Sequence, residues 1–150
     1  MELLVTYEEL QRLIESKTGH KLRLSKNEDG TLKVAYSLEI SVPFYGKAQK
    51  EIYVNLSINR IDGDDLYLTY SSAKGLDMML SGAKMFLGDI IERTNLLSWG
   101  DNEREVIVHI NRVAQYASIN NYHRLRELVI DPVIGIKDKG LQLSFGLRLN

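Results

Sequence analysis

The chain has 150 residues, a formal net charge of -1 and no cysteine, so disulfides, thiolate metal ligands and cysteine nucleophiles are excluded. A protein with this charge has no overall basic field to attract nucleic acid, and we expect no nucleic-acid partner. The length, together with a charged fraction of 26%, predicts a single globular domain over residues 1–150.

The first segment predicts a short helix. The apolar run Leu3-Leu4-Val5 has no basic leader and is too short for a signal peptide or a membrane span, so we expect a cytoplasmic protein without stable membrane insertion. Thr6 and Glu9 have the spacing of a capping box, and apolar residues follow at helical spacing to about Lys17. Thr18-Gly19 ends this helix.

A run of antiparallel strands follows. Apolar and polar residues alternate over four stretches, which are residues 20–24, 32–42, 52–58 and 66–70. Asn27 to Gly30 and Asp62 to Asp65 are predicted as hairpin turns, and residues 45–47 as a loop. Pro43 ends the second strand because proline cannot donate to a sheet ladder.

The segment from Lys74 to Asn95 is predicted as one long helix. Its main apolar face consists of Leu76, Met79, Leu80, Ala83, Phe86, Leu87, Ile90 and Ile91. Met78, Met85 and Leu96 add a second apolar line, so this helix is expected to need cover on more than one side. We therefore predict an α+β fold in which a curved antiparallel sheet wraps around one long apolar helix, with a short N-terminal helix beside it. Gly82 and Gly88 are expected to permit close backbone approach.

The last third of the chain predicts more strands. Residues 99–102 form a loop, residues 106–110 a strand, and Asn111 begins a short helix through Tyr116. A further strand starts at Leu128, and Pro132 within it predicts a bulge or an edge position. Residues 141–149 alternate as the final strand, after a turn at residues 138–140.

No set of residues predicts a reaction. Gly63-Asp64-Asp65 resembles a polymerase metal turn, but a tight turn alone explains it, so we expect no metal there. His20, His109 and His123 are not spaced as metal ligands, and His109 is predicted to be a solvent-facing strand residue. Aromatic and basic residues mix over 116–126, as is common on surfaces. We expect no enzyme, no cofactor and no metal.

The strand series from Leu32 to Tyr70, the helix from Leu76 to Ile91 and the closing strands from Val106 to Leu149 together resemble the TULIP group. These are tubular lipid-binding proteins related to bactericidal permeability-increasing protein, with small single-unit bacterial relatives. The resemblance lies in the pattern of elements and not in a short motif. It implies a sheet wrapped around the helix, with a groove between them that takes lipid acyl chains.

Two functions follow from the long helix. Methionine adapts to irregular apolar ligands, and we predict that Met78, Met79, Met85, Phe86 and Ile90 bind a lipid or another apolar small molecule. The alternative is a non-catalytic structural or assembly protein, whose exposed apolar helix face or strand edge binds a partner chain. A homo-oligomer is compatible with both.

Overall fold

The computed structural model describes residues 1–72, 77–116 and 119–148, without the side chains of residues 38–40 and 77–81. Within these residues the chain forms two antiparallel sheets, with strand orders β2-β3-β4-β5-β7-β6 and β1-β9-β8. The elements are β1 (Glu2–Thr6), α1 (Tyr7–Thr18), β2 (Leu22–Lys26), β3 (Leu32–Val42), β4 (Gly46–Asp62), β5 (Asp65–Ser71), α2 (Asp77–Thr94), β6 (Leu97–Trp99), β7 (Glu105–His109), α3 (Ile110–Tyr116), α4 (Tyr122–Leu128), β8 (Val129–Ile136) and β9 (Gly140–Leu147).

The six-stranded sheet buries one face, as its sequence alternation predicts. Val34 of β3 pairs with Val54 of β4, and both side chains are buried. The same apolar phase continues through Leu66 of β5 to Val106 of β7, which is 1% exposed. Since alternate strand residues point to opposite faces, these positions form one continuous apolar surface under the helices.

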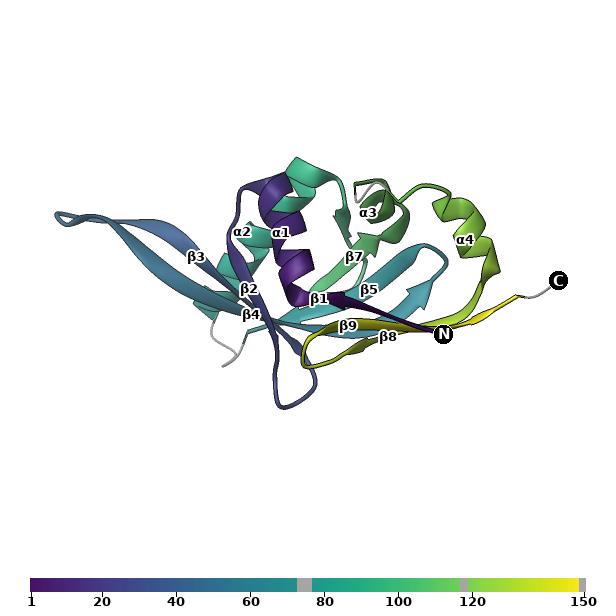
Figure 1. The fold of residues 1–150 in the computed structure, drawn as a ribbon. Helices are drawn as coiled ribbons and strands as arrows, with labels where there is room; N and C mark the ends of the chain where they lie inside the picture. The colour runs from purple at the N-terminus through teal and green to yellow at the C-terminus, as the bar shows by residue number, and fades with distance from the viewer. Residues whose placement is uncertain (73–76, 117–118, 149–150) are drawn as a thin grey trace.

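Helices α1 and α2 lie side by side on that surface (Figure 1). The predicted caps of α1 are present: the Thr6 hydroxyl accepts a hydrogen bond from the Glu9 N–H at 3.2 Å, and Gly19 ends the helix in the left-handed conformation, with φ 74°. From α2, Ala83, Phe86, Leu87 and Ile90 enter the core. Gly82 allows α2 to lie close to β4, because a Cβ there would lie 2.8 Å from Ile52 Cδ1.

The three-stranded sheet joins the two ends of the chain. Strand β1 pairs with β9 from Glu2↔Ser144 to Thr6↔Gly140, and Leu141 packs against the edge of the core. Strand β8 is an edge strand, and its register shifts between Ile130 and Val133. The bulge predicted from Pro132 is therefore confirmed, and Asp131 within it has a positive φ of 51°.

The prediction of a single curved sheet wrapped around one long apolar helix is wrong. The structure has two sheets, and its described residues contain four helices. Helix α2 is not covered on every side, because Met85 is 71% exposed whereas Phe86 is buried. Helices α1 and α2 both pack on the sheet, so two helices and not one bury the apolar faces of its strands. The predicted start of α2 at residues 74–76 lies outside the described residues. The α+β class and the antiparallel pairing are confirmed.

Strands β3 and β4 continue well beyond the body of the protein as a two-stranded hairpin (Figure 1). Strand β4 begins at Gly46, six residues before the strand predicted from Ile52, because a tight turn replaces the expected loop. Phe44 in this turn has φ 70° and Gly46 has φ 86°. The turn exposes Phe44 and Tyr45 fully to solvent. We call residues 37–51 the arm.

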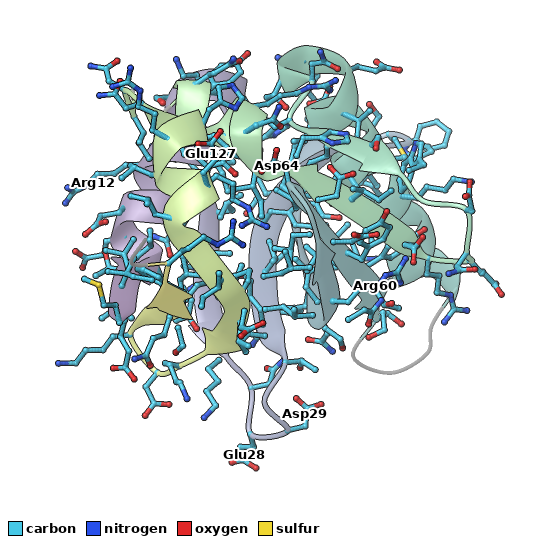
Figure 2. All side chains as sticks on the ribbon, turned by 90° about the vertical axis from the view of Figure 1, so that its right-hand side faces the viewer. Arg12, Glu28, Asp29, Arg60, Asp64 and Glu127 are labelled. Atoms are coloured by element: carbon cyan, nitrogen blue, oxygen red, sulfur yellow. The ribbon has the colours of Figure 1, made fainter. Side chains whose placement is uncertain are left out.

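The β2–β3 and β4–β5 hairpins match their predicted turns. Glu28 and Asp29 form the tip of the β2–β3 hairpin (Figure 2), which Gly30 closes with φ 88°. Asp62 pairs with Asp65 across a two-residue turn between β4 and β5. Among the described residues, no helix has the length and hydropathy needed to cross a membrane.

Candidate functional site

An apolar cavity of about 240 Å³ lies between the helices and the inner face of the six-stranded sheet. Most of its lining comes from leucine, isoleucine and valine. The lining residues are Leu10, Leu13, Ile14, Lys17, Thr18, Leu22, Leu24, Leu32, Val34, Val54, Leu56, Ile58, Leu66, Leu68, Phe86, Leu87, Ile90, Thr94, Leu96, Leu97, Val106, Val108, Val113, Ile136 and Leu141. Cavities with walls of this kind stay dry and take apolar ligands, even at about 150 Å³.

Two regular spacings create these walls. Leu10, Leu13 and Ile14 recur at helical spacing along α1 and so share one face of that helix. On the sheet side, alternate residues of each strand contribute, such as Leu66 and Leu68 of β5. The cavity therefore follows from the amphipathic pattern of elements that pack at an angle without filling the space between them.

The few polar side chains in the wall are mostly satisfied internally. The Thr18 hydroxyl donates to the Ile14 carbonyl at 2.7 Å, and the Thr94 hydroxyl donates to the Ile90 carbonyl at 2.7 Å. Lys17 differs, because it is exposed and its Nζ lies 4.8 Å from the centre of the Tyr116 ring. This contact joins α1 to α3 beside the cavity and places one cation at its rim.

The predicted ligand-binding residues are divided by the structure. Phe86 and Ile90 line the cavity and are nearly fully buried. Met85 lies on the exposed side of α2, away from the cavity. The side chains of Met78 and Met79 lie outside what the structure describes.

Sequence reasoning missed the contribution of α1. The sequence predicts the apolar face of α1, but the predicted ligand site includes residues of α2 only. The signal was present in the spacing of Leu10, Leu13 and Ile14, since two amphipathic helices on one sheet have to face the same space.

Phe86 lines the cavity and also packs against a buried tyrosine of β3. Its ring stacks on Tyr36, with centroids 4.0 Å apart and planes 14° apart. Burial raises the pKa of the Tyr36 hydroxyl well above its ordinary value, because the charged phenolate would lose its hydration. Tyr36 is therefore a neutral packing residue.

Asp62, Asp64 and Asp65 lie in or beside the β4–β5 turn. The carboxylates of Asp64 and Asp65 have protein partners, which are Tyr122 for Asp64 and His109 for Asp65. The Tyr122 hydroxyl of α4 donates to Asp64 Oδ1 at 2.7 Å, and Arg126 donates to the Gly63 carbonyl at 3.0 Å. Burial and this carboxylate raise the pKa of Tyr122. Asp64 thus anchors α4 to the turn, and the part of the chain that the structure describes contains no cluster of three or more metal-ligating side chains.

A polar contact ties the segment between α1 and β2 to α2 next to the core. His20 Nε2 hydrogen-bonds Asp89 Oδ2, and Arg93 Nε donates to Asp89 Oδ1 at 2.9 Å. The His20 ring also meets the edge of Phe86 at 5.3 Å between centroids. The hydrogen bond from His20, followed by that from Arg93, lowers the pKa of the Asp89 carboxyl. This pair fixes α2 over the sheet.

Comparison with known proteins adds no relative: no family model, no curated protein and no solved structure matches the chain.

Proposed function

We propose that the protein binds an apolar small molecule, such as a single acyl chain, in the cavity between α1, α2 and the six-stranded sheet. The observation that supports this is the cavity itself, about 240 Å³ in volume with almost wholly apolar walls. A packed core normally leaves few voids larger than a water molecule, whereas ligand pockets are mostly apolar with a few polar groups that orient the ligand.

Lys17 supports an acidic head group on this ligand. It is the cation at the rim, beside the half-buried Val113 of α3. A carboxylate at the end of an acyl chain would reach the ammonium group while the chain stays in the cavity. We therefore favour a fatty acid over a neutral hydrocarbon.

Calorimetric titration with decanoate and with decanol tests this proposal. The wild-type protein is expected to bind both, and decanoate more tightly. Val113→Trp should abolish binding of both, because the indole ring fills the cavity from its wall. Gln115→Trp, on the exposed side of the same helix, is the matched control and should bind like the wild type.

Lys17→Gln separates the head group from the chain. It should weaken decanoate binding by roughly two- to fivefold, the range expected for an exposed ion pair, and leave decanol unchanged. Equal binding of decanoate by the wild type and Val113→Trp would contradict the proposal, since the ligand would then lie elsewhere.

The arm favours a second function, the assembly of two copies of this chain. Strand β2 pairs with β3 only as far as Tyr36, and β5 pairs with β4 only from Asn55, so among the described residues no further strand of the sheet extends along either side of the arm. Free strand edges readily pair with another chain, and two identical arms can pair about a two-fold axis. Sedimentation velocity over a range of concentrations should then show dimers, and a variant without the arm should be monomeric at every concentration.

A further inference from the structure

Three polar side chains on neighbouring strands form a hydrogen-bonded chain. His109 Nδ1 lies 2.9 Å from Asp65 Oδ1, and His109 Nε2 lies 3.0 Å from Ser98 Oγ. The three residues come from β5, β7 and β6, which are adjacent in the sheet. Asp65 is directly opposite His109 in the pairing register.

This cluster is separate from the apolar cavity. The sequence neighbours Leu66, Val108 and Leu97 line the cavity, and alternate strand residues point to opposite faces. Asp65, His109 and Ser98 therefore lie on the outer face of the six-stranded sheet. All three are partly exposed, and the His109 side chain is 18% exposed, so the imidazole is held in place but is still reachable from solvent.

We infer that Ser98 is an activated nucleophile, with His109 as its general base and Asp65 as the positioning residue, and that this face of the sheet hydrolyses esters. A nucleophile within hydrogen-bond reach of a base, and a base oriented by a third group, is the arrangement that activates a serine hydroxyl. It recurs on unrelated folds, where geometry and not sequence position defines it.

The two hydrogen bonds select one tautomer of His109. A carboxylate can only accept, so Asp65 takes the proton-bearing Nδ1 as its donor. Nε2 is then free of a proton and accepts from the Ser98 hydroxyl. The base is thus oriented before substrate arrives, and Asp65 also stabilises the imidazolium that forms during attack.

The backbone N–H of the residue after Ser98 points to the open edge of the sheet. Strand β6 is the last strand of its sheet, and the Gly100 N–H donates to the Glu105 carbonyl while the His109 N–H donates to the Leu96 carbonyl. Because hydrogen bonds in an antiparallel pair alternate, the Trp99 N–H then points away from β7, toward the open edge. A donor on the residue after the nucleophile can stabilise the negative oxygen of a tetrahedral intermediate.

The chemistry proceeds in two balanced steps. Ser98 Oγ attacks the ester carbonyl as its proton passes to His109 Nε2, and collapse of the intermediate breaks the ester bond and returns this proton to the leaving alcohol. Water then attacks the acyl-serine, and its proton passes to Nε2. The second collapse releases the carboxylic acid and gives the proton back to Ser98.

The pairing registers indicate the class of ester. Ser98 pairs with Ile107, Ile107 with Tyr67, and Tyr67 with Arg60, so these four side chains form one row on the outer face. The Arg60 guanidinium lies 3.8 Å above the Tyr67 ring, and Figure 2 shows Arg60 well apart from Asp64 at the turn. Three strand spacings amount to about 14 Å. We expect an ester whose apolar part covers Ile107 and Tyr67 and whose acidic group meets Arg60.

Modification by diisopropyl fluorophosphate tests the nucleophile directly. Mass spectrometry should find one adduct, on Ser98, and Ser98→Ala should remove it. Ser57 is the control within the same molecule, because it lies on the same face opposite Thr69 and should stay unmodified. No adduct at Ser98, or equal modification of Ser57 and Ser98, would overturn the inference.

Turnover tests the roles of the other two residues. With p-nitrophenyl acetate, His109→Ala should lower kcat by about 10²- to 10⁴-fold, and circular dichroism should show a folded variant. Asp65→Asn should lower kcat and leave KM unchanged, because the imidazole loses the carboxylate that selects its tautomer and orientation. Arg60→Ala should raise KM for the p-nitrophenyl monoester of succinate, which carries an acidic group, and leave KM for p-nitrophenyl acetate unchanged. If wild type and Ser98→Ala hydrolyse the acetate equally, the site is a structural hydrogen-bond network only.

Discussion

At the scale of single residues, two buried tyrosines differ in one hydrogen bond. The Tyr7 hydroxyl donates to the Lys137 carbonyl, whereas the Tyr36 hydroxyl is buried without a hydrogen-bond partner among the described residues. A buried polar group without a partner costs about 1–3 kcal/mol, and a typical satisfied bond contributes roughly 1 kcal/mol. Removing the Tyr7 hydroxyl should therefore lower the free energy of unfolding, whereas removing the Tyr36 hydroxyl should not.

We predict that Tyr7→Phe lowers the free energy of unfolding by about 1 kcal/mol. Tyr36→Phe should leave it unchanged or raise it, because phenylalanine keeps the ring that stacks on Phe86. Urea titrations of both variants and the wild type provide the comparison. An equal loss in both variants would show that the Tyr36 hydroxyl has a partner such as a buried water.

At the scale of elements, the two glycines described within α2 allow a matched test. A Cβ at Gly88 would lie 3.7 Å from Trp99 Cζ2, which is an ordinary contact, whereas at Gly82 it would meet Ile52 Cδ1 at 2.8 Å. Alanine is favoured over glycine inside a helix by about 1 kcal/mol. Gly88→Ala should thus raise the melting temperature by about 2–4 °C, and Gly82→Ala should gain less or lose stability. Equal gains at both positions would mean that Ile52 moves aside freely.

Local signals in the sequence predict some elements well. The cap at Thr6, the left-handed Gly19 and the alternation of β3 each depend on neighbouring residues, and the structure agrees with them. Helix α4 gave no such signal, since none of its residues is buried and Asn121 makes no capping side-chain bond. Strand β1 has five residues and finds its partner only at β9, at the other end of the chain, which a local pattern does not specify.

The sites follow the same division. The burial of Phe86 and Ile90 follows from their shared face on a recognisable helix, whereas their role in binding a ligand stays a prediction. The hydrogen bonds of His109 were not predicted, because Asp65 is 44 residues away in sequence and only the strand pairing brings the two together. His109 lies on the outer face of the sheet, as its strand phase predicts, but its side chain is only 18% exposed and not solvent-facing, because strand phase does not identify the neighbours that cover it.

At the scale of the whole molecule, the protein divides into a body and an arm. The body contains the three-stranded sheet, the rest of the six-stranded sheet and all the buried core residues that the structure describes, whereas residues 43–51 of the arm are exposed. An isolated two-stranded hairpin is marginally stable in water, so the body or a second copy has to hold the arm in its extended form. The arm itself should contribute little to the stability of the body.

Replacing residues 39–49 with Asn-Gly tests this division. Leu38 and Lys50 are paired, so a two-residue turn can join them, and Asn-Gly is the sequence that such turns favour. If the body folds on its own, the melting temperature of the dilute protein should change little. If the arm joins two copies, the wild type should melt at a higher temperature as its concentration rises, and the shortened variant should not. A shortened variant that melts much lower at all concentrations would mean that the arm is part of the folding unit.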